Sequence, residues 1–324
     1  MKRLRWVRGA TLKPTYLACG NWYTLSHSLV FHTGLRAGAE QAARFANRFI
    51  PKTPVVEREL TAAFDEANTV LGIRSAFLLH TGWYKDTYFV GPVEKADGAR
   101  VFVKSFANRE AKALEALGTD IVARLAKGHF RTADILADEG DVLAFELLER
   151  GKTCSPDFEQ NVLAMCSDAL EQASPAMHLH DRLTLVAAHF ADRDRPMPPL
   201  GPIPQVMGHG DCTPWNMFRD RFGSPCLVDT ERAGVCSPYS DWFHFCTQPL
   251  AMKGERPAIE RLLCDPIVER VGDETARQFL LAYLLRELET DLQQWNGGRR
   301  HHQLAMLIEI RTRMIDDLTT RPTA

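Results

Sequence analysis

Residues 209–216 read HGDCTPWN, and residues 227–245 read LVDTERAGVCSPYSDWFHF. The first stretch places Asp211 directly after His-Gly and Asn216 five residues later. The second places Asp229 behind two apolar residues, a pattern that favours an aspartate at the end of a short strand. His-Gly-Asp alone also occurs as ordinary turn chemistry. The interpretation therefore depends on both stretches together.

These side chains are the kind that phosphoryl transfer from a nucleotide requires: a group that orients the acceptor hydroxyl and oxygen ligands for a metal ion. Asp211 is expected to accept the proton of that hydroxyl or to orient it. Asn216 offers a neutral amide oxygen, and Asp229 offers a carboxylate, which is the preferred ligand type for Mg²⁺. The two stretches thus predict a base and two metal ligands.

Lys104 follows the β-like run RVFV and is placed to reach the phosphates of a nucleotide. A carboxylate on the next helix is expected to fix the direction of its side chain. The segment NREAKALEAL, residues 108–117, offers Glu110 and Glu115 for this purpose. The residues alone do not decide which of the two carboxylates is the partner of Lys104.

The two stretches resemble the motifs of the aminoglycoside phosphotransferases and the related choline and small-molecule kinases, which share the protein-kinase-like fold. The catalytic loop of that family reads HGDxxxxN. Its metal loop is similar to D-x-E followed by P-x-x-D, and here Asp229, Glu231, Pro238 and Asp241 stand in that order. The resemblance covers about residues 75 to 290. It implies ATP or GTP as phosphoryl donor, Mg²⁺ as cofactor, and a small-molecule or sugar hydroxyl as acceptor.

The resemblance also implies a role for each matching residue. His209 is expected to pack beneath the catalytic loop, and Asp241 to hold that loop through backbone hydrogen bonds. Because REAKAL resembles the helix of the family, Glu110 is preferred over Glu115 as the partner of the lysine. The remaining implied roles are catalytic base for Asp211, metal ligands for Asn216 and Asp229, and phosphate binding for Lys104.

Two departures from protein kinases narrow the class. The turn expected to cover the phosphates, within HTGWYKDTYFV, contains only Gly82, unlike the glycine-rich loop of protein kinases. About eleven residues separate Asp229 from Asp241, too few for a long activation segment. A protein kinase is therefore disfavoured. A kinase-like scaffold that binds a nucleotide without useful transfer stays as the alternative.

The chain of 324 residues is long enough for two lobes. The pattern predicts an α+β protein with a protein-kinase-like two-lobed fold, in which a β-rich N-lobe precedes a mainly helical C-lobe. The expected division is a partly helical N-terminal extension over 1–70, a nucleotide-binding N-lobe over 71–150 and a helical C-lobe over 151–324. Segment 145–153, FELLERGKT, resembles the hinge that receives the nucleobase.

Hydrophobic periodicity and breaker residues predict the individual elements. A helix near 107–118 is expected to end at Gly118, and the proline-rich segment 195–204 is expected to be a loop. Strand-like runs are expected between 73 and 106. The predicted helices are 37–50, 56–71, 157–173, 177–191, 273–295 and 301–318.

Composition excludes several classes. The formal charge of −2 gives no general reason to expect a nucleic-acid partner. No run of about 18 apolar residues exists, so no transmembrane segment is expected. None of the eight cysteines lies in a CxxC pair, which argues against a zinc ribbon and favours reduced thiols in the cytoplasm.

The acceptor is not defined by a motif. The segment LRELETDLQQW supplies Glu287, Glu289 and Asp291. These carboxylates suit an acidic pocket for a polycation such as an aminoglycoside, and they equally suit the solvated face of a helix. Both interpretations stay open, and so do sugars and amino alcohols as acceptors.

Overall fold

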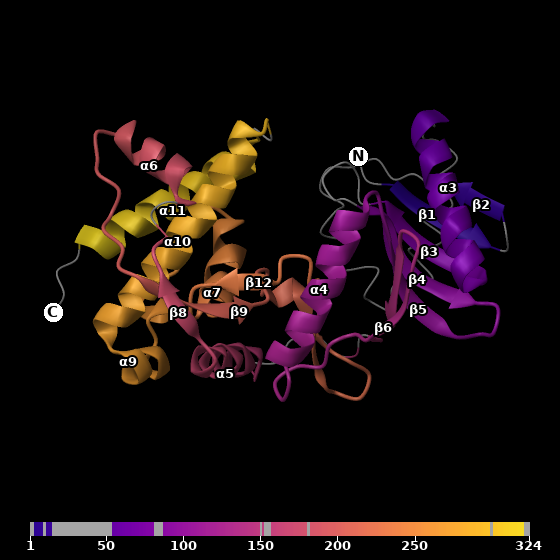
Figure 1. Ribbon diagram of the computed structural model, residues 1–324, viewed down its shortest axis with the longest axis horizontal. Helices are drawn as coiled ribbons and strands as arrows, with labels where there is room; N and C mark the ends of the chain where they lie inside the picture. Colours follow the sequence, from indigo (N-terminus) through magenta and orange to yellow (C-terminus); the bar gives the residue numbers. More distant parts are fainter. Residues whose placement is uncertain are drawn as a thin grey trace. The chain divides into compact units, whose positions relative to one another are not determined.

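The structure is a computed structural model, and its chain groups into two compact units (Figure 1). The strand-rich unit comprises residues 1–123, 130–154 and 218–231. The helical unit comprises 124–129, 155–217 and 232–324. The residues that the structure describes are 3–8, 11–14, 54–80, 87–149, 151, 157–179, 182–298 and 301–320.

The strand-rich unit is built on a seven-stranded antiparallel sheet in the order β2-β1-β3-β4-β5-β7-β6. The register pairs Val103 of β5 with Gly91 of β4 on one side and with Ala144 of β7 on the other. The strands are β1 (Arg3–Arg8), β2 (Thr11–Pro14), β3 (Ile73–His80), β4 (Thr87–Lys95), β5 (Arg100–Phe106), β6 (Ile135–Glu139) and β7 (Val142–Glu146).

One helix covers each face of this sheet. Val101 and Val103 of β5 pack with the apolar side chains of α3 (Pro54–Leu71), among them Ala63 and Ala67. Phe106, on the other face of β5, packs in a cluster with Ala111 and Ala116 of α4 (Arg109–Leu125). Successive side chains of a strand alternate between faces, so Lys104 lies on the α4 face.

Helix α4 does not end at Gly118, as the glycine suggested, but continues to Leu125. Gly118 and Thr119 are both buried in the middle of the helix. A glycine inside a helix costs about 1 kcal/mol relative to alanine, and burial of the surrounding face outweighs that cost here. The predicted end of the helix at Gly118 is therefore wrong.

The helical unit is organised around two long helices, α10 (Asp273–Asn296) and α11 (His302–Thr320). They follow one another in sequence and pack against each other. Figure 1 shows α10 and α11 in orange and yellow. The other helices of this unit are α5 (Asp157–Glu171), α6 (Thr184–Ala191), α7 (Ser240–Ala251), α8 (Ile259–Leu262) and α9 (Asp265–Val271). Helices α6, α7 and α9 contact α10, so α10 is the central element of the unit.

A three-stranded sheet in the order β12-β9-β8 belongs to the helical unit. Its strands are β8 (Ser174–Met177), β9 (Ile203–Gly208) and β12 (Gly234–Cys236). Two predictions are wrong at one end: the helix expected over 177–191 is observed only as α6 (Thr184–Ala191), since Met177 belongs to β8, and the loop expected over 195–204 ends where β9 begins at Ile203. Backbone pairing in the sheet outweighs the local preference in both places.

The candidate loops follow strands, as the apolar runs predict. The HGDCTPWN stretch begins directly after β9 and ends in the short 3₁₀ turn η3 (Pro214–Asn216). The hairpin of β10 (Met217–Arg219) and β11 (Pro225–Leu227) leads into Asp229. β12 then leads into α7, which carries Asp241 in its first turn.

The α+β class and the order of a strand-rich part before a helical part are confirmed. The boundaries near residues 70 and 150 stay a prediction, because contacts group the chain in discontinuous segments. The predicted helix at 37–50 and the turn around Gly82 lie outside the described residues. Among the described residues, no helix carries a run of apolar side chains long enough to cross a bilayer.

Candidate functional site

Lys104 is held between two carboxylates in the strand-rich unit. Its Nζ lies 2.7 Å from Oε1 of Glu115 and 3.2 Å from Oδ1 of Asp229. The side chains of Lys104, Glu115 and Asp229 are only 11%, 3% and 15% exposed. Charge-assisted hydrogen bonds in such shielded surroundings are stronger than neutral ones. The structure thus joins the predicted phosphate-binding lysine to the predicted metal-binding aspartate across 125 positions of sequence.

Glu115, and not Glu110, is the partner of Lys104, so the preference for Glu110 is wrong. Glu110 lies in the first turn of α4 and is exposed, whereas Glu115 is buried on the face toward the sheet. A separation of five residues turns a side chain by about 140° around a helix. Ala111, Glu115 and Thr119 form one i, i+4 stripe of α4, but the exposed face carries Leu114 and Leu117, so the apolar pattern did not mark the buried face.

The loop that carries Asp229 is fastened to α4 through the next residue. Thr230 Oγ1 donates to Glu115 Oε1 at 3.2 Å and lies 2.9 Å from Thr119 Oγ1. Asp229 itself has a φ of 71°, in the left-handed region that a non-glycine residue adopts at an energetic cost. Such strain persists only where the surroundings enforce the conformation, and the contacts of Thr230 do so here.

The backbone of the HGD loop in the helical unit is set by Asp241. Its Oδ2 accepts the backbone N–H of His209 at 2.7 Å, and its Oδ1 accepts that of Gly210 at 2.9 Å. Gly210 has a φ of 77°, and a Cβ there would come within 2.2 Å of the carbonyl oxygen of Arg232. Only glycine therefore fits this turn without displacing the backbone.

The other predicted residues of this loop also lie together. The side chain of His209 is fully buried, and its Nδ1 accepts the backbone N–H of Asp211 at 3.3 Å. Asn216 is buried as well and donates its amide nitrogen to the carbonyl oxygen of Asp211 at 2.9 Å. This bond fixes which end of the amide is nitrogen, so Oδ1 of Asn216 is the atom suited to a cation.

His244 of α7 contacts the Asp211 side chain, a contact that the sequence interpretation missed. Its Nε2 lies 3.2 Å from Oδ1 of Asp211. Its Nδ1 lies 3.2 Å from the hydroxyl of Tyr283 and 3.7 Å from Oε2 of Glu287, both on α10. A usable signal was the spacing: His244 stands three residues after Asp241 on one helix, so both face the same loop.

The hydroxyl groups of Thr247 and Tyr283 link His244 to the backbone of α7. Thr247 donates its one hydroxyl proton to the carbonyl oxygen of Phe243, so Tyr283 donates to Thr247 at 2.7 Å and accepts from Nδ1 of His244. The other ring nitrogen, Nε2, lies 3.2 Å from Oδ1 of Asp211, so the ring of His244 lies between the carboxylates of Asp211 and Glu287.

Cys212 lies within the HGD loop, but its chemistry is that of a structural residue. Its side chain is fully buried, and burial raises the pKa of its thiol well above the usual value, with a further contribution from the charge of Asp241. The reactive form of a cysteine is the thiolate, and burial disfavours that form. Nucleophilic catalysis by Cys212 is therefore disfavoured.

Asp229 and Asn216 each offer an oxygen atom of the type that hard cations prefer, and each is oriented by contacts within its own unit. They belong to different units, Asp229 to the strand-rich one and Asn216 to the helical one. Among the described residues, no group of three or more His, Cys, Asp and Glu side chains is arranged to hold a metal ion.

Comparison with known proteins gives matches among solved structures alone. No protein-family model matches the sequence, and no curated protein matches it. The apoenzyme of macrolide 2'-phosphotransferase from Brachybacterium faecium is 12% identical over 80% of this chain and 97% of its own, with a TM-score of 0.47. Choline kinase from Streptococcus pneumoniae is 12% identical over 79% of this chain and 97% of its own, with a TM-score of 0.43.

A third match is the GDP complex of aminoglycoside 2'-phosphotransferase-IIIa. It is 12% identical over 80% of this chain and 98% of its own, with a TM-score of 0.47. At 12% identity and TM-scores of 0.43 to 0.47, the function of this chain has to be inferred from its own residues.

Proposed function

We propose that this protein is a phosphotransferase that moves the γ-phosphoryl group of ATP or GTP onto a hydroxyl group of a small molecule. The observation that carries the proposal is the pairing of Lys104 with both Glu115 and Asp229. A lysine held by two carboxylates keeps its charge and a fixed direction, as a group that binds phosphates requires.

Mg²⁺ fits this proposal through Asp229 and Asn216, and it would supply positive charge beside the β- and γ-phosphates. Lys104 binds the phosphates of the donor. The positive φ of Asp229 and the anchoring by Thr230 keep the carboxylate in one place before the nucleotide arrives. Preorganised charge of this kind is what stabilises the transition state of phosphoryl transfer.

Asp211 acts on the acceptor hydroxyl. Its backbone is set by His209, Gly210 and Asp241, and its side chain is oriented by His244. A carboxylate held in this way accepts a hydrogen bond from the hydroxyl and takes its proton as the new O–P bond forms.

Thermal unfolding with ATP or GTP, with and without Mg²⁺, tests the donor site. At about 100 times its Kd, a nucleotide stabilises the folded state by roughly 2.7 kcal/mol, which raises the Tm by several degrees. Asp229→Asn keeps the shape of the side chain and tolerates the positive φ. This substitution is expected to abolish the Mg²⁺-dependent part of the rise in Tm. Asp65→Ala on the exposed face of α3 is the control. No shift with either nucleotide in a folded sample would remove the proposal.

The two glutamates of α4 provide a matched pair for testing Lys104. Glu115→Gln removes the charge that fixes the lysine, and we expect the Kd for the nucleotide to rise about tenfold, equivalent to about 1.4 kcal/mol. Glu110→Gln is exposed and is expected to change the Kd by less than about twofold. Isothermal titration calorimetry measures both. An equal effect of the two substitutions would contradict the role given to Lys104.

A further inference from the structure

An open pocket in the helical unit lies next to the side chains that hold Asp211. Its cavity volume is about 160 Å³, below the roughly 300–1,000 Å³ usual for drug-sized ligands, so the pocket suits a small ligand. Glu287 lines the pocket, and its carboxylate lies 3.7 Å from His244, whose other ring nitrogen contacts Asp211. Glu287 and His244 thus connect the lining of the pocket to the proposed base, Asp211.

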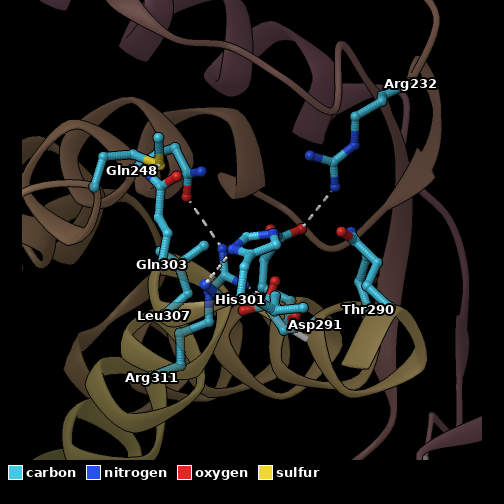
Figure 2. A pocket seen from close by; sticks show the side chains of 12 residues that line it. Arg232, Gln248, Thr290, Asp291, His301, Gln303, Leu307 and Arg311 are labelled. Atoms are coloured by element: carbon cyan, nitrogen blue, oxygen red, sulfur yellow. Dashed lines mark hydrogen bonds and ion pairs between the residues drawn. The ribbon is translucent and has the colours of Figure 1, made fainter. Parts of the chain in front are cut away.

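The charges in the lining of this pocket are balanced within the protein. Arg311 pairs with Asp291 and also lies 3.1 Å from Oε2 of Glu287, and Arg232 lies 3.3 Å from Oε1 of Glu287. Figure 2 shows Arg232 and Arg311 on different sides of the pocket. Two arginines thus offset two carboxylates, and a charged ligand finds no uncompensated partner among the charged side chains of the lining.

Glu287 and its neighbours on α10 are neither an acidic pocket nor a solvated face. Burial alone would raise the pKa of Glu287, but the charges around it, Arg311 first among them, outweigh that effect and lower the pKa below its usual value. Glu289 accepts the backbone N–H of Val186 at 2.9 Å, at the N-terminus of α6. All three carboxylates of α10, Glu287, Glu289 and Asp291, are buried.

Neutral polar side chains supply the remaining polar surface of the pocket. Gln248, Gln294, Gln303 and Thr290 all line it. Gln248 uses its Oε1 for Arg311, which directs its amide nitrogen to other acceptors. Thr290 donates its hydroxyl to the carbonyl oxygen of Arg286 and so presents oxygen lone pairs. These groups offer both donors and acceptors, as a ligand rich in hydroxyl groups requires.

His301 adds a donor, and leucines add an apolar side. Nδ1 of His301 accepts the backbone N–H of Leu304, so a neutral ring carries its proton on Nε2. Figure 2 shows His301 near the centre of the pocket, between Gln303 and Thr290. Leu304 and Leu307 also line the pocket, and apolar side chains suit the carbon face of a sugar ring.

We infer that this pocket receives the acceptor, and that the acceptor is an uncharged polyhydroxylated molecule such as a sugar, a glycoside or a cyclitol. The inference rests on the proposed function for the transfer itself, but its recognition chemistry stands on the pocket alone. An ammonium group would lose its hydration without gaining an unpaired carboxylate, which makes a polycation unfavourable. A phosphate or carboxylate group meets the same difficulty at the paired arginines.

Binding measurements on the full chain test the inference without turnover. The probes are methyl α-D-glucopyranoside and myo-inositol as neutral ligands, glucosamine and kanamycin as cations, and glucose 6-phosphate as an anion. We expect a neutral polyol to bind more tightly than every charged probe. Gln248→Leu and Gln303→Leu are each expected to raise its Kd by roughly two- to tenfold. Gln172→Leu, exposed at the end of α5, is expected to leave it unchanged.

Arg232→Met tests whether charge balance in the pocket determines its preference for neutral ligands. Arg232 is 39% exposed, and its removal leaves Glu287 with Arg311 as the remaining arginine partner. The ratio of glucosamine affinity to methyl glucoside affinity is then expected to rise roughly tenfold. Tighter binding of a charged probe by the unaltered protein, or no binding of either neutral polyol, would overturn the inference.

Nucleotide stabilisation measured on the same samples separates this inference from the proposed function. If a polyol binds but no nucleotide raises the Tm, the inference about the pocket is supported and the proposed phosphotransferase function is contradicted. If a nucleotide raises the Tm in a Mg²⁺-dependent way but the pocket prefers amines, the proposed function is supported and the inference about the pocket is contradicted. Each result therefore decides one of the two proposals independently.

Discussion

Asp211→Asn is expected to lower turnover about 10²- to 10⁴-fold while leaving the Kd for the nucleotide within about twofold of its original value. Asparagine keeps the shape of the side chain and still accepts a hydrogen bond from His244, so the loop keeps its geometry. It is a poor acceptor for the hydroxyl proton. Product formation from the polyol that the unaltered protein phosphorylates fastest gives the rate, and calorimetry gives the affinity.

A second Asp–His pair on the same unit provides the control. Asp168 lies 2.8 Å from Nε2 of His129, and its side chain is 60% exposed. Asp168→Asn changes the same atoms in a comparable pair away from the HGD loop, and we expect turnover to stay unchanged. Full turnover by the Asp211→Asn variant would exclude Asp211 from the mechanism.

Arg311→Met is expected to be the most destabilising of the substitutions considered, at about 3–5 kcal/mol. The guanidinium of Arg311 bonds to Asp291 and Glu287 on α10 and to Gln248 on α7, and its side chain is only 6% exposed. Methionine fills a similar volume but leaves two buried carboxylates without their main cation. Urea unfolding followed by circular dichroism measures the loss.

Arg313 on the same helix is the matched control. It pairs with Glu309 four residues earlier, and its side chain is 64% exposed. Arg313→Met is expected to cost less than about 1 kcal/mol. A triple variant, in which Arg311→Met is combined with Glu287→Gln and Asp291→Asn, is expected to recover most of the loss because no buried charge remains unpaired. Equal effects of Arg311→Met and Arg313→Met would show that the buried network contributes little to stability.

The sequence predicts the parts of this molecule that depend on short spacings. Asp211 and Asn216 lie in one loop of eight residues, so their proximity follows from the sequence. Asp241 lies at a spacing from this loop that the family motif also contains. Lys104 was identifiable because the alternation along β5 and the helix that follows it are local patterns. The sequence also predicts that a strand-rich part precedes a helical part, because the spacing of apolar residues changes from that of strands to that of helices.

The sequence does not predict contacts that depend on the packing of distant elements. Choosing Glu115 over Glu110 requires knowing which face of α4 meets the sheet. The contacts of His244 with Tyr283 and Glu287 span 39 and 43 positions and depend on how α7 lies on α10. The helix end expected at Gly118 failed for the same reason, since burial decides whether a glycine ends a helix.

The strand-rich unit is discontinuous, and this has a consequence for how the protein is made. Residues 218–231 belong to that unit, although the rest of it ends at residue 154. Phe218 and Cys226 pack with Leu148, and Asp220 pairs with Arg131 at 2.9 Å. A nascent chain that ends before these residues lacks those partners. The unit that begins first on the ribosome therefore cannot be completed until the segment carrying Asp229 has emerged, and a fragment cut near residue 154 is expected to be an incomplete domain.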